Sequence, residues 1–304
     1  MTQASDSRAP IGRVLTAMVT PMTEDGAIDH DGLAALAVRL VDDGHDGLVV
    51  SGTTGESPTT TDAEKSTILR TVVEAVGERA CIVAGVGTYA TAHTVELARA
   101  AEQAGADALL VVTPYYSKPT QAGLVAHFTA VADATGLPNV LYDIPGRSGI
   151  PIETPTLQRL AEHERIVGVK DAKGDLSAGL EVIATTDLAY YSGDDPLNLA
   201  WMASGAVGVI SVVGHAFGRE YLDMLDAVER GDLAEARQIH VDLIPAVRTI
   251  MSRSSQGAIR AKAVSQLLGV IGSRQTRLPL LPASDEEVGQ LRDMLVAAGK
   301  EVSR

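Results

Sequence analysis

The chain is poor in cysteine and in the residue spacings that metal sites need. Cys81 is the single cysteine among 304 residues, which excludes an internal disulfide. It lies in a short apolar run, so we expect a buried packing residue. The seven histidines are scattered, and no Cys/His cluster has the spacing of metal ligands. The sequence therefore predicts no metal site.

Long apolar runs are also missing. No stretch approaches the roughly 20 apolar residues of a membrane span. Residues 1–10 are polar and lack the apolar core of a secretory signal. We expect a soluble, cytoplasmic protein without a membrane partner.

Positive charge is the minority sign. The chain has 25 Lys and Arg against 39 Asp and Glu, which gives a formal net charge of −14. Because a negative surface repels phosphate backbones, we do not expect nucleic acid as a partner. Aromatic residues make up only 3% of a chain that is 45% hydrophobic, so the positions of its seven tyrosines are informative.

The chain does contain a regular alternation of short apolar runs and amphipathic segments. Near-continuous apolar runs are typical of parallel strands buried on both faces, and the segments between them are long enough for crossover helices. About eight such units predict an α/β fold, the (β/α)8 TIM barrel. A doubly wound open sheet is the alternative, disfavoured because 85–87 holds only the start of a dinucleotide fingerprint. The expected strands are 14–20, 47–50, 81–85, 108–113, 139–143, 166–170, 189–192 and 207–211.

The last part of the chain follows a different pattern. After Val213 no strand pattern appears, and helices are expected at 220–230, 233–251, 258–268 and 285–298. We therefore assign residues 1–230 to the barrel and 231–304 to a helical C-terminal extension packed on it. Inside the barrel, residues 61–64 have capping-box spacing, and Gly44 and Gly105 fall where helix C-caps belong.

Lys170 ends one of the apolar, strand-like runs. Apolar surroundings disfavour the ammonium form and lower the pKa of a lysine amine, and the neutral amine is a nucleophile. Lys170 is thus a candidate for Schiff-base formation. A lysine paired with an acid inside a barrel is the structural alternative.

Other unusual residues follow the expected strands, at the end where TIM barrels carry their active sites. This convergence favours the functional interpretation of Lys170 and predicts a site for a small carboxylated carbonyl compound. The residues are Thr53 and Thr54, Tyr115 and Tyr116, Tyr142, Arg147, Gly193 and Ile210.

Each of these loops also has a simpler interpretation. Residues 52–55 could form a plain turn, or a cradle in which backbone N–H groups and two hydroxyls face a carboxylate. Tyr115 and Tyr116 could pack against a neighbouring subunit or could carry a proton. Arg147 could be a surface charge or could bind a substrate carboxylate through two hydrogen bonds.

Five motifs follow one another in order along the chain. They are Gly52-Thr53-Thr54-Gly55-Glu56, Thr113-Pro114-Tyr115-Tyr116, Tyr142-Asp143-Ile144-Pro145-Gly146-Arg147, Gly168-Val169-Lys170-Asp171-Ala172 and Ser192-Gly193-Asp194-Asp195. These motifs resemble those of the lysine-type, pyruvate-dependent aldolases, and most closely the dihydrodipicolinate synthase family. The resemblance covers the chain from about Val14 to the C-terminal helices. It implies condensation of pyruvate with L-aspartate 4-semialdehyde in diaminopimelate and lysine biosynthesis, with no cofactor beyond a covalent imine.

The resemblance implies a role for each matching residue. Lys170 would form the imine with pyruvate, and Thr53 and Thr54 would hold the pyruvate carboxylate. Tyr142, Thr53 and Tyr116 would form a proton relay, in which Tyr116 reaches in from an adjacent subunit of a homotetramer.

Three further positions would complete the pocket. Arg147 would bind the carboxylate of the semialdehyde. Gly193 and Ile210 would line the pocket through backbone groups.

The chain departs from the family pattern at two places. Asp143 stands where the family often has asparagine; its position alternates away from Tyr142, so it should not touch the substrate. Lysine-inhibited relatives use histidines on the second helix and an asparagine and a glutamate near the third strand. Because a cation repels the lysine ammonium, we expect weak or no lysine inhibition here, where the positions read Asp62, Lys65, Tyr89 and His93.

Two other functions compete with the synthase. A sister aldolase would act on a sugar acid or on 4-hydroxy-2-oxoglutarate; Arg147 disfavours the sialate lyases, which usually lack an arginine there. A catalytically silent barrel would serve as a sensor or scaffold. The intact set of Lys170, Tyr142, Tyr116 and Thr53 argues against that second alternative.

Overall fold

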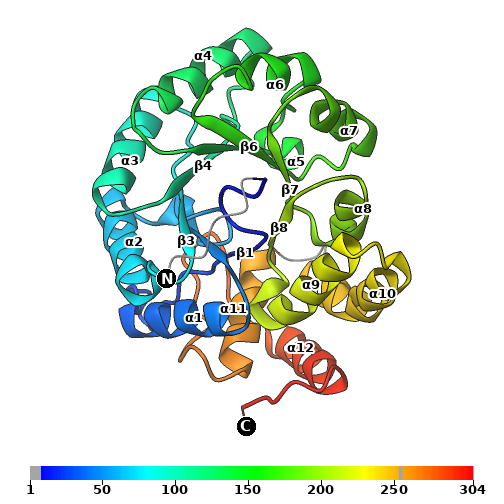
Figure 1. Ribbon diagram of the computed structural model, residues 1–304. Helices are drawn as coiled ribbons and strands as arrows, with labels where there is room; N and C mark the ends of the chain where they lie inside the picture. Colours follow the sequence, from blue (N-terminus) through cyan, green and yellow to red (C-terminus); the bar gives the residue numbers. More distant parts are fainter. Residues whose placement is uncertain (1–7, 253–255, 304) are drawn as a thin grey trace.

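Eight parallel strands close into a barrel in chain order (Figure 1). The computed structural model describes residues 8–252 and 256–303, so most of the polar segment 1–10 lies outside the described residues. β1 pairs with both β2 and β8, which leaves the sheet without an edge and confirms the TIM barrel over the open sheet. The strands are β1 (Val14–Ala17), β2 (Gly47–Val50), β3 (Cys81–Gly85), β4 (Ala108–Val112), β5 (Asn139–Asp143), β6 (Ile166–Asp171), β7 (Ala189–Ser192) and β8 (Gly208–Ser211).

Helices surround the barrel, and their ends follow local sequence signals. The predicted capping box is present, because the Thr61 side chain accepts from the Glu64 amide while Glu64 accepts from the Thr61 amide. Gly44 and Gly105 follow α1 and α3 with φ of +99° and +92°. The outer helices are α1 (His30–Asp42), α2 (Asp62–Val76), α3 (Thr91–Gln103), α4 (Gln121–Ala132), α6 (Thr154–Leu160), α7 (Leu176–Thr185), α8 (Asn198–Ala203) and α9 (Gly214–Glu229).

α9 begins earlier than predicted, at Gly214 instead of residue 220. Its first turn holds two glycines, Gly214 and Gly218, and its backbone leaves helical geometry at Phe217, so the sequence shows little helical pattern there. Both glycines are needed for close packing. A Cβ on Gly218 would lie 2.1 Å from Cε1 of the buried His45 ring, and one on Gly214 would lie 3.1 Å from its Nε2.

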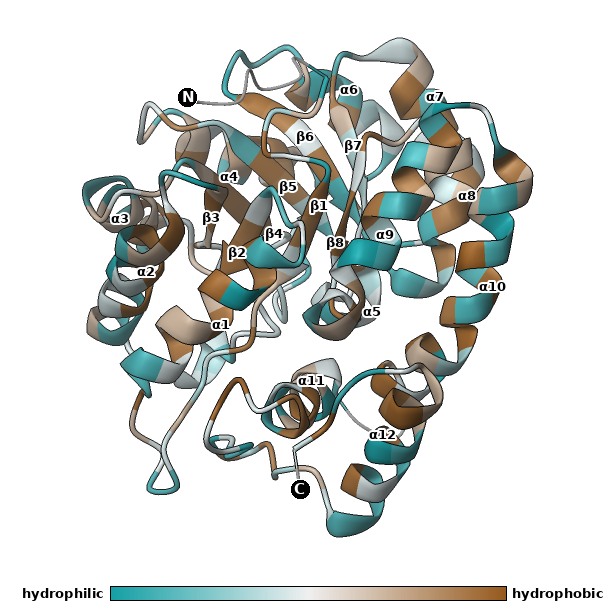
Figure 2. Ribbon diagram, turned by 60° about the horizontal axis from the view of Figure 1, so that its bottom comes forward, coloured by the Kyte–Doolittle hydropathy of each residue, from teal (hydrophilic) through white to brown (hydrophobic). Residues whose placement is uncertain are grey.

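Two apolar layers make up the core. An inner cluster fills the barrel with side chains such as Leu15, Val49, Leu110 and Tyr191. An outer cluster lies between the strands and the apolar faces of the helices, where Figure 2 shows the hydrophobic colouring. Among residues 8–252 and 256–303, no helix has both the length and the apolar composition needed to cross a membrane.

The C-terminal region is helical, as predicted. α10 (Leu233–Ile250), α11 (Gly257–Leu267) and α12 (Asp285–Ala297) follow the barrel. Figure 2 shows α11 at the same end of the barrel as the short helix α5 (Pro145–Ser148), which follows β5. This end carries the carboxyl ends of the strands, so the C-terminal region is placed beside the candidate site.

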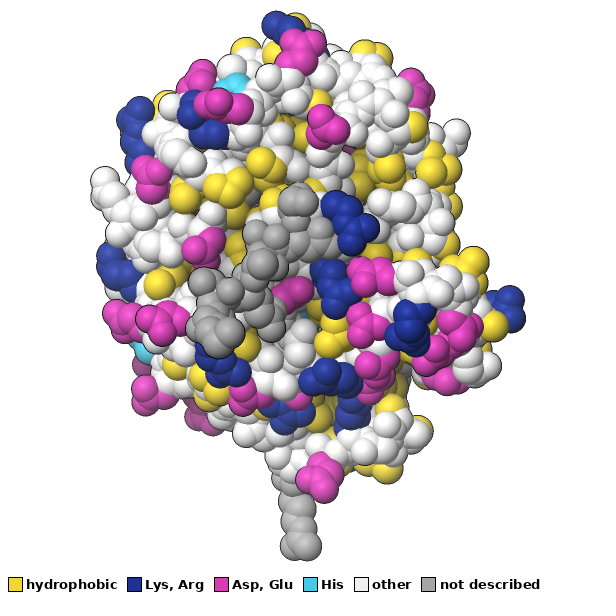
Figure 3. Space-filling model, viewed as in Figure 1, with side chains coloured by type: hydrophobic (Ala, Val, Ile, Leu, Met, Phe, Trp, Pro, Cys, Tyr) yellow, Lys and Arg dark blue, Asp and Glu magenta, His cyan; other side chains and the backbone are white. Residues whose placement is uncertain are grey.

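Cys81 opens β3 and is half-buried instead of fully buried, because it lies at the amino end of the barrel; burial still raises the pKa of its thiol to about 12. On the face in Figure 3, acidic and basic side chains are interspersed. Elsewhere in the described residues, opposite charges also pair: Arg13 contacts Asp226 and Glu229 at 3.1 and 2.9 Å.

Candidate active site

Lys170 and Tyr142 are direct neighbours on adjacent strands. They are register partners on β6 and β5, and the Lys170 Nζ lies 4.3 Å from the centroid of the Tyr142 ring. Both are buried, with exposed fractions of 4% and 7%. Since side chains alternate along a strand, this pair points into the barrel while the next residues, Asp143 and Asp171, point outward.

Burial changes the protonation of both groups. It lowers the pKa of Lys170 from 10.5 to about 7; the opposite charge of Asp195 works against this shift, and the Arg147 charge adds to it. Burial also raises the pKa of Tyr142 to about 12. Near neutral pH the lysine is therefore a usable amine nucleophile beside a phenol that keeps its proton. Such a pair can attack a carbonyl and protonate the oxygen that leaves.

Gly193 and Ile210 lie on the lysine side of the barrel. A Cβ on Gly193 would come within 2.8 Å of the Lys170 Cγ and 2.9 Å of its Cε, so only glycine leaves room for the lysine side chain. Ile210 is buried in the inner cluster together with Tyr142. Neither Gly193 nor Ile210 is among the residues that line the cavity beside this pair.

A cavity of about 220 Å³ opens beside this pair. Its lining includes Thr53 from the loop after β2, Tyr142 from β5 and Arg147 from the short helix α5. Thr54 is buried next to Thr53 and, like Lys170, is outside the lining. The Tyr142 ring thus lies both against the lysine amine and on the cavity wall, and the volume suits a small organic acid.

The loop that presents Thr53 is a tight turn. The Gly55 amide donates to the Gly52 carbonyl at 3.1 Å, and the Glu56 amide donates to the Thr53 carbonyl at 3.2 Å. Ser51 and Glu56 flank this turn with φ of +55° and +56°, the left-handed region that favours glycine. The loop is therefore a turn by geometry and also part of the cavity wall, so the two interpretations are compatible.

Tyr116 lies apart from the other candidates in a single chain. Its side chain is 93% exposed and its φ is +73°. Tyr115, to which the sequence pattern assigned no separate role, lines the cavity and packs edge-to-face on Tyr89 with ring centroids 5.6 Å apart. Adjacent tyrosines in a sharply turning loop point in different directions, and the sequence does not indicate which one faces the cavity.

Asp143 points away from the cavity, as expected. It accepts a hydrogen bond from the Ile152 amide at 3.1 Å and pairs with the Lys173 amine at 3.3 Å. Burial raises the pKa of Asp143 to about 6, against the effect of the Lys173 charge.

Asp195 ends the motif Ser192-Gly193-Asp194-Asp195, and no role was predicted for it from the sequence. It is buried, accepts from the Ser211 hydroxyl, and accepts from the amides of Val212 and Val213 at 3.0 and 3.2 Å. It therefore connects the loop after β7 to the loop after β8. Its negative charge raises the pKa of Lys170, against the effect of burial. The two consecutive acidic residues directly after a predicted strand, Asp194 and Asp195, are the sequence feature that could have indicated this role.

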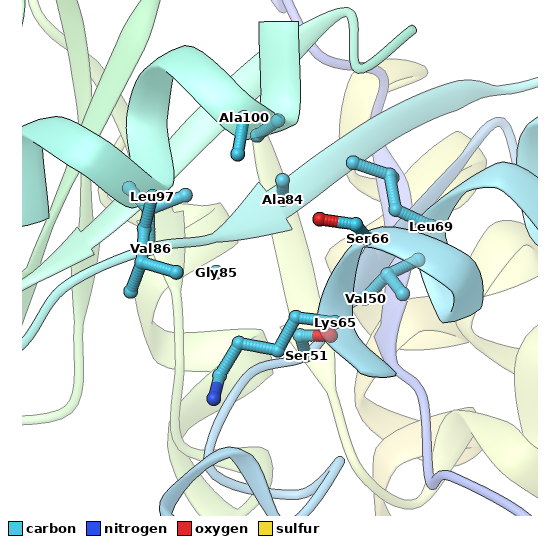
Figure 4. Close-up of a pocket in the computed structure, with 11 residues that line it drawn as sticks. Val50, Ser51, Lys65, Ser66, Leu69, Ala84, Gly85, Val86, Leu97 and Ala100 are labelled. Carbon is cyan, nitrogen blue, oxygen red and sulfur yellow. The ribbon is translucent and has the colours of Figure 1, made fainter. Parts of the chain in front are cut away.

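The four positions linked with lysine inhibition lie on α2, on α3 and in the loop before α3. Asp62 pairs with His93 at 2.8 Å, and the Lys65 amine donates to the Thr60 carbonyl at 2.5 Å. Figure 4 shows the Lys65 amine directed away from the apolar side chains of a small cavity of about 20 Å³. That cavity is too small for an amino acid, and Lys65 adds a positive charge beside it.

The fold and the site together define a class: barrel enzymes that carry a buried lysine at the end of a strand. The chain belongs to the dihydrodipicolinate synthetase family, whose model matches residues 10–298. It is 62% identical over 296 residues to a 4-hydroxy-tetrahydrodipicolinate synthase of Kineococcus radiotolerans, covering 97% of this chain and 96% of the relative. It is 56% identical to 4-hydroxy-tetrahydrodipicolinate synthase 2 of Streptomyces coelicolor, covering 99% and 100%.

Solved structures agree. A dihydrodipicolinate synthase of Bacillus anthracis superposes with a TM-score of 0.91 at 40% identity, covering 94% of this chain and 98% of that one. The enzyme of Cyanidioschyzon merolae, solved with lysine bound, superposes with a TM-score of 0.92 at 39% identity, covering 95% and 98%. The family is that of a pyruvate-dependent lyase, as the motifs predicted.

Proposed function

We propose that this protein is a 4-hydroxy-tetrahydrodipicolinate synthase, which condenses pyruvate with L-aspartate 4-semialdehyde in the diaminopimelate and lysine pathway. The observation that carries the proposal is the buried amine of Lys170, 4.3 Å from the centroid of the Tyr142 ring. The names of relatives at 56% and 62% identity over nearly the whole chain support the same reaction.

The chemistry follows from the pair of side chains. The neutral Lys170 amine adds to the ketone carbon of pyruvate, and Tyr142 protonates the carbinolamine oxygen, which leaves as water to give an imine. The imine accepts electron density, so the pyruvate methyl group loses a proton and becomes an enamine. The enamine carbon attacks the aldehyde; the amine of the semialdehyde then closes the ring and releases Lys170. The reaction needs no cofactor beyond this covalent imine.

The carboxylates of pyruvate and of the semialdehyde are bound by residues from different loops. Thr53 and Thr54 hold the pyruvate carboxylate, which fits the position of Thr53 on the cavity wall. Arg147, on the same wall, binds the carboxylate of the semialdehyde. Gly193 and Ile210 shape the pocket around Lys170 through their backbone.

Tyr116 enters the proposal as a residue contributed by an adjacent subunit. An exposed tyrosine with left-handed backbone does little for a single chain, and a relay with Tyr142 and Thr53 requires at least a dimer. We propose a homotetramer. We also propose a cytoplasmic location. The chain divides into a barrel of residues 1–230 and a C-terminal extension of residues 231–304.

An acceptor panel tests the function. The purified protein is given pyruvate with aspartate semialdehyde, and is tested separately for cleavage of sialate, 2-keto-3-deoxygluconate and 4-hydroxy-2-oxoglutarate. Product from the semialdehyde alone is the expected result; cleavage of one of the others instead would move the protein to a sister aldolase. In parallel, borohydride with pyruvate should add mass to the wild type and none to Lys170→Ala. An adduct on that variant would show that another lysine is the nucleophile.

A further inference from the structure

A buried ion pair joins the loop after β2 to the C-terminal region. The Glu56 carboxylate pairs with the Lys262 amine of α11, and both side chains have an exposed fraction of 0%. The remaining polar contacts are satisfied as well, because Lys262 donates to the Gln275 carbonyl at 2.7 Å and Glu56 accepts from the Arg277 amide at 2.9 Å. Two full charges are rarely removed from water in this way unless each has a partner.

Glu56 is the last residue of the turn that carries Thr53 and Thr54. Its backbone is left-handed, and its amide donates to the Thr53 carbonyl at 3.2 Å. A non-glycine residue adopts this conformation at a cost unless its surroundings hold it there. The pair with Lys262 and the hydrogen bond from the Arg277 amide hold the Glu56 side chain in place.

Arg277 binds the chain just beyond this turn. Its guanidinium donates to both carboxylate oxygens of Glu64 at 2.6 and 2.9 Å, and to the Thr59 carbonyl at 2.9 Å. The segment between the second strand and the second helix is thus held at Glu56, in its middle, and at Thr59, near its end, by residues from the C-terminal region. The barrel alone supplies neither contact.

We propose that Glu56 and Lys262 are positioning residues for the pyruvate carboxylate, acting through the Thr53–Thr54 turn. This inference rests on the proposed function, because it takes pyruvate as the ligand of that turn. The burial of the pair lowers the pKa of Lys262, while the nearby Glu56 charge opposes that shift, so the two charges depend on each other. Loss of either charge would loosen the turn at Glu56, while the Thr20 hydroxyl still donates to the Gly55 carbonyl at 2.7 Å. It would leave Tyr142 and Arg147, which stand on and after β5, unchanged.

The test uses kinetics on Glu56→Gln, Lys262→Met and the double variant Glu56→Gln/Lys262→Met. We expect each single variant to raise the KM for pyruvate at least tenfold and to change the KM for aspartate semialdehyde less than threefold. Glu287→Gln is the matched control. It removes the ion pair of Arg260 with Glu287 at 2.9 Å, which also joins α11 to its neighbour but does not touch the turn.

The double variant separates positioning from stability, and it remains useful if a single variant does not fold. It leaves no unpaired buried charge, so its melting temperature should return toward that of the wild type while its KM for pyruvate stays raised. A KM for pyruvate within twofold of wild type in the folded double variant would overturn the inference. So would an equal rise in Glu287→Gln.

Imine trapping with borohydride and pyruvate distinguishes failure of the positioning inference from failure of the proposed function. If the wild type forms the imine and the variants need the same pyruvate concentration for half-maximal trapping, the positioning inference fails and the proposed function stands. If the wild type forms no imine, both are overturned.

Discussion

Replacing Lys170 by methionine should abolish imine formation and make the protein more stable near neutral pH. Methionine has nearly the length of lysine and carries no charge, so it fills the space beside Gly193 without a cavity. The wild-type lysine is costly because its amine is held partly neutral inside the barrel, whereas the unfolded chain exposes an ordinary lysine. The same burial that makes the amine reactive thus destabilises the folded state.

The size and sign of the effect follow from the pKa of Lys170, which is 10.5 for an ordinary lysine and about 7 in the folded protein. Above pH 10.5 the amine is neutral in both states and carries no penalty. As the pH falls toward 7, the unfolded lysine takes up a proton before the folded one does, so the penalty grows to an upper limit of about 5 kcal/mol. At pH 7 about half of the folded lysines are still protonated, and an exchange of similar side-chain volume in a packed core costs up to about 1.5 kcal/mol, so together these offset about 2 kcal/mol of that limit. A net gain of about 3 kcal/mol corresponds to a Tm increase of about 6 °C for a chain of this length.

The assay is thermal unfolding of wild type and Lys170→Met without pyruvate, at pH 7 and pH 10. We expect the variant to melt higher at pH 7, with most of the difference gone at pH 10. Lys118→Met, at an exposed lysine, is the control and should change Tm by about 1 °C or less at both pH values. A variant that melts lower than wild type at pH 7, or by the same margin at both pH values, would refute the reasoning.

Four further results are expected. Arg147→Ala should lower kcat/KM for aspartate semialdehyde about 10- to 100-fold, the worth of a charged hydrogen-bonded pair, and leave pyruvate imine trapping within about threefold; equal losses would indicate a structural role. Tyr116→Phe should lower kcat about 100-fold without lowering Tm, and a fully active monomer in sedimentation would contradict the role of Tyr116. L-Lysine should not give half-inhibition below millimolar concentration, since Lys65 repels its ammonium group; sub-millimolar inhibition would disprove this. Stability should fall as the pH is lowered from 6.5 to 4, because burial lowers the pKa of His45 and His215 from 6.5 to about 4, so the unfolded chain binds their protons first. Each histidine accounts for about 3 kcal/mol, and a melting temperature that stays constant from pH 7 to 4.5 would contradict the expectation.

The barrel was predictable because its strands are buried on both faces. Each strand leaves a short, near-continuous apolar run, and the start of α2 is marked by the Thr61–Glu64 capping box. The start of α9 was not predictable, since Gly214 and Gly218 are required by the close approach of Thr16 and His45, which are distant in the sequence. Local patterns report local structure, and such a contact is not local.

The candidate site shows the same division. Lys170, Tyr142 and Arg147 could be placed at one end of the barrel because the ends of parallel strands converge there. The burial of Glu56 and Lys262 could not be foreseen, because in the sequence a charged residue on a loop or a helix looks solvated. Only the folded chain brings the two charges together.

The contact between Glu56 and Arg277 spans 221 residues, and it has a consequence for protein synthesis. At translation rates of about 5–20 residues per second, about 10–40 seconds pass between the appearance of the Thr53–Thr54 turn and the arrival of the residues that hold it. During that time the turn has been synthesised, but the C-terminal residues that contact it have not. A messenger RNA cut short before α11 would therefore encode every strand of the barrel and still lack Lys262 and Arg277, which bind the Glu56 carboxylate at the end of this turn.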